Sequence, residues 1–244
     1  MKWVCVALMA LSLDVSAVTV GSGINKSEQR PVSSFDRIEL RGSGTLTINQ
    51  NTTPSLTVKA DDNLLREIST TVDNGVLIVK PISSIQPKTP IEYYVTVKNI
   101  TEVKMEGTAK VKSNGSLVFD RLLLALKGAT AADLVLQGKL LDITIDGTGR
   151  VDIVGAVDQQ QVEIDGTGKY FAMNLRTKRT DITVNGTGKA KVYATEQLDA
   201  RVNGAGKVIY RGSPQVTQKI RGSGSVTETN GYRLRTRNIK QAKP

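Results

Sequence analysis

Four positively charged residues recur at nearly equal intervals in the second half of this 244-residue chain. Each directly follows a glycine-containing motif, and they are Arg150, Lys169, Lys189 and Lys207. Cations repeated at one spacing could bind an anionic partner such as lipopolysaccharide, an acidic glycan or a nucleic acid. Nucleic acid is the least favoured of these and is not predicted, because almost no aromatic residues lie among the basic ones. The pattern is also typical of a solvated edge, where salt screens like charges from one another.

A second recurring set places a carboxylate or an amide directly before the first glycine of the motif; it consists of Asp146, Asp165, Asn185 and Asn203. Two carboxylates on neighbouring repeats could bind Ca²⁺, or serve a glycoside hydrolase or a polysaccharide lyase. Aspartate and asparagine before glycine are equally ordinary turn residues. Because the later repeats lose the carboxylate, we expect a structural role for this set, with no metal and no cofactor.

The composition excludes most catalytic schemes. The chain contains no His, so it cannot form a Ser-His-Asp or Cys-His nucleophile system, a His-bearing zinc site or an imidazole acid–base catalyst. Its single cysteine, Cys5, cannot form an internal disulfide or a thiolate metal cage. We therefore predict that the protein is not an enzyme.

The glycine motifs define a repeat. Successive first glycines are 18 to 21 residues apart, and they are Gly107, Gly128, Gly147, Gly166, Gly186, Gly204 and Gly222. Apolar and polar residues alternate beside each motif, as in Ile143-Thr144-Ile145, which is typical of half-buried strands. This periodicity predicts an all-β fold, a parallel β-helix with coils of about 19 residues. The glycines predicted to form its corners are Gly147, Gly149, Gly166, Gly168, Gly186, Gly188, Gly204 and Gly206.

The N-terminus has the pattern of an export signal. Residues 1–17 combine a basic start, an apolar run and a small-residue cleavage pattern, so Val18 is the expected mature N-terminus. This predicts an exported bacterial protein, in the periplasm, at the cell surface or secreted. No later segment is long and apolar enough to span a membrane.

Residues 18–231 are predicted to be one β-helix domain, with irregular N-terminal coils at 32–105 and regular coils at 106–230. Within the irregular part, Asp61 to Ile68 favours a helical turn that could cap the open end of the solenoid. Residues 232–244 form a basic tail that is expected to be disordered. Its arginines join the candidate anion-binding residues, and they are Arg233, Arg235 and Arg237.

The predicted domain resembles one bacterial family. The segments that carry the resemblance are Gly21 to Asn25, Arg30 to Ile38, Arg41 to Gly44 and Asp73 to Val79, followed by the Asx-Gly-Thr-Gly motifs. They are similar to the “putative auto-transporter adhesin, head GIN domain” proteins, over about residues 21 to 230. The resemblance implies an exported, right-handed β-helical domain whose molecular function is unassigned, with no catalytic residues to carry over.

Three functions remain open at this stage. The preferred one is a non-enzymatic, adhesin-like β-helix that binds an anionic envelope glycan or lipopolysaccharide through its basic edge. The alternatives are a carbohydrate-active enzyme with a groove along the strands, and a periplasmic scaffold that forms a homo-oligomer. A groove with converging acidic and basic side chains would favour the enzyme, whereas flat faces with separate rows of charge would favour binding.

Overall fold

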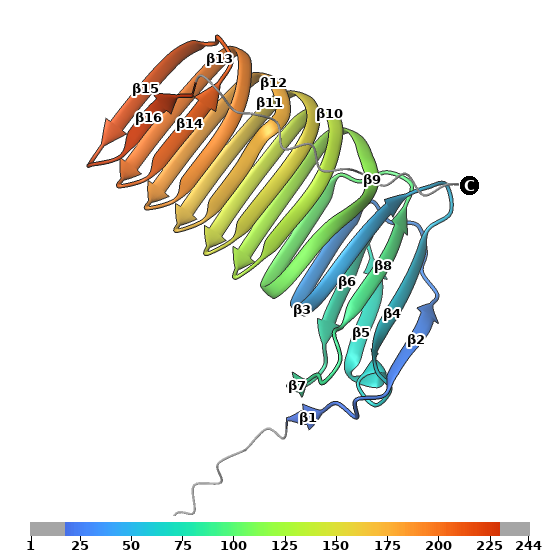
Figure 1. The fold of residues 1–244 in the computed structure, drawn as a ribbon. Helices are drawn as coiled ribbons and strands as arrows, with labels where there is room; N and C mark the ends of the chain where they lie inside the picture. The colour runs from blue at the N-terminus through green and yellow to red at the C-terminus, as the bar shows by residue number, and fades with distance from the viewer. Residues whose placement is uncertain (1–17, 230–244) are drawn as a thin grey trace, which may run out of the picture.

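The computed structural model describes residues 18–229, so the predicted signal peptide and the basic tail with Arg233, Arg235 and Arg237 lie outside the described residues. Within this range the chain forms sixteen strands, one 3-10 turn and no α-helix. Successive coils stack side by side into an elongated solenoid (Figure 1). The predicted all-β parallel β-helix is confirmed.

The regular part of the solenoid consists of long strands that bend at the corners of a coil. These strands are β9 (Glu102–Gly128), β10 (Ala131–Gly147), β11 (Arg150–Gly166), β12 (Lys169–Gly186) and β13 (Lys189–Gly204). Neighbouring coils pair in parallel, and Ala131 pairs with Arg150 just as Gly147 pairs with Gly166. This offset of 19 residues confirms the predicted coil length. Shorter strands complete the stack: β14 (Lys207–Arg211), β15 (Gln215–Arg221) and β16 (Ser225–Glu228).

The alternating pattern places one apolar row per strand inside the solenoid. Ile143 and Ile145 of β10 are at most 2% exposed, and Val162 and Ile164 stack on them from β11 at 1% or less. Each buried aliphatic side chain stabilises the fold by about 1.5–3 kcal/mol relative to an exposed one. A slip of one residue would turn the whole row outward, so this burial fixes the register of the coils.

The two glycines of each corner motif meet different requirements. The first has a positive φ, 115° at Gly147, and a Cβ there would lie 2.8 Å from the carbonyl oxygen of Gly128 on the preceding coil. The second packs against the core, because a Cβ on Gly168 would lie 2.7 Å from Cγ2 of Ile145. Positive φ together with the close approach of the preceding coil's backbone selects glycine at the first position, and lack of space beside the core side chains selects it at the second.

The first part of the chain forms the opposite end of the stack, and its strands are β2 (Asn25–Arg30), β3 (Arg37–Gln50), β4 (Ser55–Asp61), β5 (Ile68–Asp73), β6 (Val76–Pro81) and β8 (Glu92–Val97). β3 pairs in parallel with β9 on one side and with β6 and β8 on the other. Beyond them, β5 pairs antiparallel with β6, β4 with β8, and β2 with β4. The short strands β1 (Thr19–Val20) and β7 (Ile85–Gln86) form a separate parallel pair. The solenoid thus changes from parallel to antiparallel pairing at this end.

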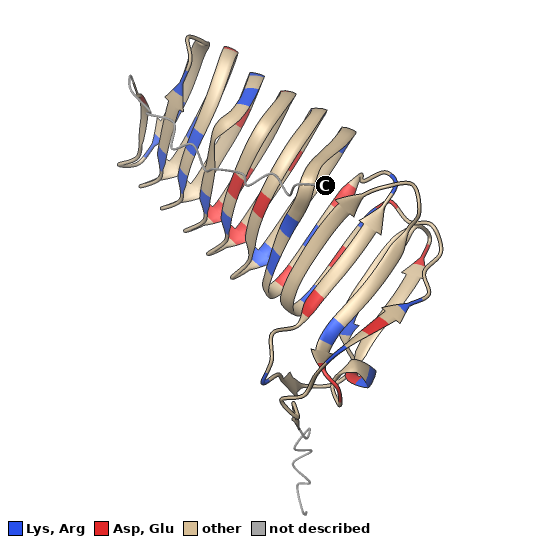
Figure 2. Cartoon of the chain, turned by 45° about the vertical axis from the view of Figure 1, so that its right-hand side comes forward, with Lys and Arg blue, Asp and Glu red and all other residues tan. Residues whose placement is uncertain are grey.

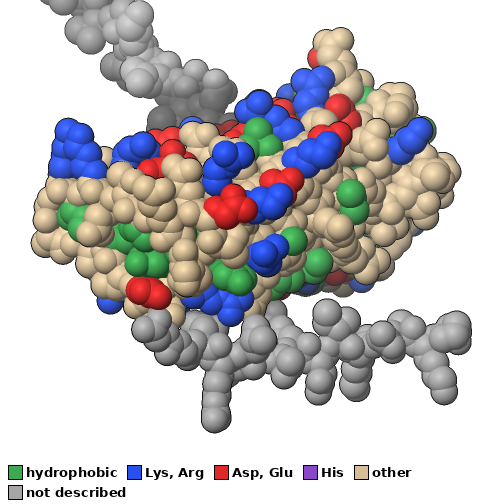
Figure 3. All heavy atoms as spheres, turned by 90° about the horizontal axis from the view of Figure 1, so that it is seen from above, with side chains coloured by type: hydrophobic (Ala, Val, Ile, Leu, Met, Phe, Trp, Pro, Cys, Tyr) green, Lys and Arg blue, Asp and Glu red, His purple; other side chains and the backbone are tan. Residues whose placement is uncertain are grey.

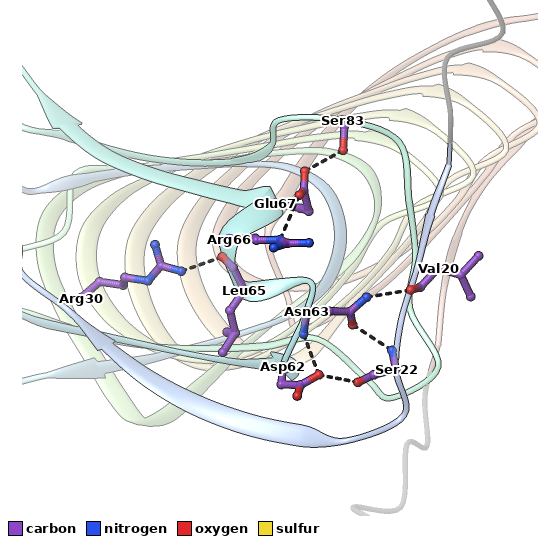
Figure 4. Close-up of polar contacts among 9 residues, drawn as sticks. All are labelled: Val20, Ser22, Arg30, Asp62, Asn63, Leu65, Arg66, Glu67 and Ser83. Atoms are coloured by element: carbon purple, nitrogen blue, oxygen red, sulfur yellow. Dashed lines mark hydrogen bonds and ion pairs between the residues drawn. The ribbon is translucent and has the colours of Figure 1, made fainter.

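A 3-10 turn, η1 (Leu65–Glu67), lies within the segment for which a helical turn was predicted. Leu64 and Leu65 are buried, with exposures of 0% and 4%. Arg30 of β2 donates a hydrogen bond to the Leu65 carbonyl at 2.7 Å, as Figure 4 shows at the end of the solenoid. The turn therefore contributes apolar side chains that help to close the core at its N-terminal end.

A buried carboxylate anchors the N-terminal segment to this end. Asp61 is 0% exposed and accepts backbone N–H bonds from Gly23 at 2.9 Å, Lys88 at 2.8 Å and Thr89 at 3.2 Å. Burial opposes ionisation of Asp61, but these donors outweigh it and hold its pKa below the ordinary value. A Cβ on Gly21 would lie 2.1 Å from Asp61 Oδ2, so only glycine fits beside the carboxylate.

The two residues after Asp61 hold the same segment through side-chain contacts (Figure 4). The Ser22 hydroxyl donates to Asp62 at 2.5 Å, and the Ser22 N–H donates to Asn63 Oδ1 at 2.8 Å. Asn63 in turn donates through Nδ2 to the Val20 carbonyl at 2.8 Å. The Gly21–Gly23 segment, with which the family resemblance begins, is therefore held in place by the residues Asp61 to Asn63.

A chain of hydrogen bonds crosses the otherwise apolar core between β11 and β12. The Tyr170 hydroxyl donates to Gln160 Oε1 at 2.5 Å, and Gln160 Nε2 donates to Thr180 Oγ1 at 2.9 Å. Thr180 and Thr177 share a bond of 2.7 Å, and Thr177 donates to the Tyr193 carbonyl at 2.8 Å. Burial raises the pKa of Tyr170 far above its ordinary value, so the phenol stays protonated and donates.

Candidate functional site

The parallel register brings the four predicted cations into one row on the outside of the solenoid. Arg150 pairs with Lys169, Lys169 with Lys189, and Lys189 with Lys207. Neighbouring strands lie about 4.8 Å apart, so the row carries one cation per coil at about that spacing. Figure 2 shows Lys and Arg recurring along one border of the stacked coils. Its three lysines, Lys169, Lys189 and Lys207, are called the lysine row below.

The first member of the row differs from the others because its charge is compensated. Arg150 donates to both carboxylate oxygens of Asp152, at 2.7 and 3.1 Å. Its guanidinium group also lies over the ring of Phe171, 4.4 Å from the centroid. A cation held in this way packs against its own coil and the next, and it is a weaker candidate for binding an external anion than a free lysine.

The lysine row has no such compensation: none of its side chains makes an ion pair or a hydrogen bond with another residue in the range 18–229. Other rows of the same coils pair their charges. Lys139 contacts Asp120 at 2.7 Å, and Lys178 contacts Asp158 at 2.8 Å. In the view of Figure 3, basic and acidic side chains lie interleaved on the surface. The lysine row is thus a line of free charge on a surface that elsewhere pairs many of its cations.

Two residues beside the row were not singled out from the sequence. Phe171 is half-buried and lies between the Arg150 guanidinium and the Lys191 ammonium, whose nitrogen is 5.7 Å from the ring centroid. Both follow a residue of the lysine row by two positions, so they share its outward face. The alternation of inward and outward residues along each strand could have identified both residues from the sequence. They add one more cation to the candidate surface, and an aromatic ring that packs between two cations.

The Asx set forms a ladder of hydrogen bonds along the neighbouring border. Asn203 Nδ2 donates to Asn185 Oδ1 at 2.8 Å, and Asn185 Nδ2 donates to Asp165 Oδ1 at 2.7 Å. An amide can donate to one neighbour and accept from the other, whereas a carboxylate can only accept, which accounts for the amides in the later coils. Among residues 18–229, no group of three or more His, Cys, Asp or Glu side chains could hold a metal ion.

A shallow depression of about 410 Å³ lies on the face that spans β3, β9 and β10. Ala125 and Thr144 form part of its lining, between longer side chains that include Lys104, Glu106 and Asp146. Glu106 is itself 3.7 Å from Lys127, so part of the charge at the rim is paired. A carbohydrate-active enzyme would need acidic and basic groups free to act on a substrate in a groove, whereas here Arg41 pairs with Glu39 and Lys127 with Glu106.

Stacked parallel coils, glycine corners and outward rows of charge define a β-solenoid of the kind that presents long, regular faces. This chain belongs to the family described as “Putative auto-transporter adhesin, head GIN domain”, which matches residues 34–214. The resemblance seen in the sequence is confirmed. The family description names adhesion and no enzymatic activity.

Several solved bacterial structures share this fold. A putative adhesin of Bacteroides fragilis superposes with a TM-score of 0.82 at 23% identity, over 86% of this chain and 99% of that one. A putative lipid binding protein of Parabacteroides distasonis gives 0.74 at 23% identity, over 88% and 100%. A putative adhesin of Parabacteroides merdae gives 0.68 at 24% identity, over 87% and 99%. Comparison with curated proteins finds no match.

The names of these structural neighbours describe adhesion or binding and not catalysis. Within the described part of the chain, no helix has the length and hydrophobicity that a membrane crossing requires.

Proposed function

We propose that this chain is a non-enzymatic, exported β-solenoid that binds an anionic envelope glycan or lipopolysaccharide through the lysine row. The observation that carries the proposal is the absence, within residues 18–229, of any counter-charge for Lys169, Lys189 and Lys207. Exposed cations in folded proteins often serve solubility, and a cation can do so even when it is paired with a nearby carboxylate. A line of unpaired cations fixed in register keeps its charge available to a ligand.

The geometry suits a linear polyanion. The row runs from coil to coil along the solenoid axis at about 4.8 Å per step, because it follows the hydrogen-bonding direction of the sheet. Phe171 beside it offers no free ring face to a ligand, because Arg150 and Lys191 lie over its ring, so the contact with the ligand is made by charge. Ligand and protein would therefore be matched in direction, with successive anionic groups of the ligand facing successive lysines of the row.

The basic tail extends the proposal beyond the described residues. Arg233, Arg235 and Arg237 supply additional cations, and their sequence carries no acidic residue to neutralise them. Export is proposed from residues 1–17, with the mature protein in the periplasm, at the cell surface or outside the cell. Lipopolysaccharide is among the probes because it is anionic, and the name of one structural neighbour, a putative lipid binding protein, is a second reason to include it.

The test compares two triple variants with the same change in net charge. The first, Lys169→Ser with Lys189→Ser and Lys207→Ser, removes the lysine row. The control replaces cations that are already paired with a carboxylate, and it is Arg121→Ser, Lys139→Ser and Lys178→Ser. Binding to polygalacturonate and to lipopolysaccharide is measured by calorimetry at low and at high salt, with and without residues 232–244.

Exposed charge pairs contribute about 0.2–1 kcal/mol each, so loss of three predicts binding weaker by roughly threefold to a hundredfold. High salt should weaken binding by the unmodified chain, and the control variant should bind like it. An equal loss of binding affinity in both triple variants would show that net charge, and not the lysine row, determines binding, and would contradict the proposal. Binding that ignored salt, the lysine row and the tail would overturn the proposal.

A further inference from the structure

The two ends of the solenoid differ in how they present their last strand. At the N-terminal end, β2 carries polar or charged side chains throughout, and Glu28 forms an ion pair with Arg30 at 2.9 Å. Charged side chains of this kind protect a strand edge from pairing with other chains. At the C-terminal end, β15 pairs only with β13 within the described range, so its other edge is unpaired there.

This edge exposes side chains that are buried one coil earlier. On β13, Leu198 and Val202 are 0% exposed. Their register partners on β15 are Val216, which is half-buried, and Ile220, which is 40% exposed. The inward row of the solenoid therefore continues into β15, but no further strand in residues 18–229 covers it. Each apolar side chain left in this state forfeits part of the stabilisation that burial would supply.

The charged side chains on the outward face of the same strand are all positive. Lys219 and Arg221 are exposed, and neither forms an ion pair within the described residues. β15 contains no Asp or Glu, and Lys219 is in register with Arg201, whose own charge is paired with Asp181 at 2.7 Å. The edge thus combines free backbone groups, two uncovered apolar side chains and two unpaired cations.

We propose that the free edge of β15 is a docking site for an extended segment of a partner protein in which apolar and acidic residues alternate. Such a segment would add one more strand to the stack through backbone hydrogen bonds. Its apolar side chains would lie over Val216 and Ile220, and its acidic ones would lie beside Lys219 and Arg221. This inference is independent of the lysine row, because it concerns a different strand and a different class of ligand.

Charge decides between this occupant and the two supplied by the chain itself. Residues 232–244 contain five basic and no acidic residues, so they would meet Lys219 and Arg221 with like charge. The same edge of a second copy would do so too, because it brings the same two cations. Like charges placed opposite each other on adjacent strands are destabilising, so both occupants are disfavoured at this edge. The lysine row shows that the solenoid can bear such a cost, which is why the test below includes both as outcomes. An acidic segment reverses the sign of both contacts.

The test uses seven-residue capped peptides, the length of β15, and the full chain. One peptide alternates valine with glutamate and the other alternates valine with lysine. Fluorescence anisotropy measures their binding to the unmodified chain, to Lys219→Glu with Arg221→Glu, and to Lys26→Glu with Lys80→Glu. The last variant changes the net charge equally in the N-terminal part of the chain, where both lysines are exposed.

The glutamate peptide is expected to bind the unmodified chain about tenfold more tightly than the lysine peptide, which is about 1.4 kcal/mol. Reversal of Lys219 and Arg221 should invert the preference, and reversal at Lys26 and Lys80 should leave it unchanged. Inversion by both variants, or by neither, would overturn the proposal. Failure of both peptides to bind would also overturn the proposal, because the edge would then be covered by the tail or by a second copy of the chain. Sedimentation velocity on the same samples would identify a second copy.

Discussion

Replacing Tyr170 with phenylalanine removes one oxygen atom from the core and thereby tests the buried hydrogen-bond chain. The phenol is fully buried and donates to Gln160 Oε1 at 2.5 Å, and Gln160 is itself 0% exposed. In Tyr170→Phe this carbonyl oxygen has lost its donor and is out of reach of bulk water. An unsatisfied buried polar group costs about 1–3 kcal/mol. For a domain of this size, that corresponds to a melting temperature lower by about 2–12 °C.

Two further variants make the result specific. Tyr210→Phe is the matched control, since Tyr210 is half-buried and makes no side-chain hydrogen bond within the described residues, so its loss should stay within about 0.5 kcal/mol. Adding Gln160→Met to Tyr170→Phe removes the orphaned carbonyl together with the hydrogen bond that Gln160 donates to Thr180, whose hydroxyl keeps its bond to Thr177. The double variant should therefore be more stable than Tyr170→Phe alone, because apolar replacement of both partners is nearly neutral.

Thermal melting followed by circular dichroism, together with urea unfolding, measures both changes. If Tyr170→Phe were as stable as the unmodified chain, the hydrogen bond would have no net value. If Gln160→Met destabilised the Tyr170→Phe variant further, the explanation through an unsatisfied carbonyl would be refuted.

Two other predictions concern the ends and the corners of the solenoid. Asp61→Asn should destabilise the protein at neutral pH. Because the folded pKa of Asp61 is lowered, its contribution is present above the ordinary aspartate pKa of about 3.9 and is lost as the pH falls through the folded value. Urea unfolding should show the two chains converging in acid, and a gap independent of pH would contradict this. Gly168→Ala should cost about 1–3 kcal/mol, because its Cβ would overlap Ile145, whereas Thr167→Ala at the exposed neighbouring position should be nearly neutral in the same assay.

The regular coils could be predicted from the sequence because their information is local. Each corner motif stands at nearly the same distance from the next, so the strands between them have to pair in register. The residue directly after each motif then falls in one row, which is why Lys169, Lys189 and Lys207 were found together. The same reasoning predicted a corner role for Gly147, but it did not separate the requirement for positive φ from the lack of space at Gly149.

Contacts between coils could not be predicted in the same way. The compensation of Arg150 depends on Asp152 in its own coil and on Phe171 in the next, where the register shifts just after Asp152. At the N-terminal end, Arg37 pairs with Glu102 across 65 residues, because the intervening strands fold beneath β3 before the chain returns. No repeat in the sequence marks that excursion. Its layers are set by long-range pairing and by the buried Asp61.

Coils of almost equal length with almost identical corners create a hazard during folding, since one coil can be looped out and the next can take its place. The row of Asp120, Lys139, Asp158 and Lys178 counts against this error. Omission of a single coil would bring Asp120 beside Asp158, or Lys139 beside Lys178, and turn attraction into repulsion. The charge in this row thus alternates in sign from one coil to the next. Looping out two coils would keep opposite charges side by side, but looping out one would not.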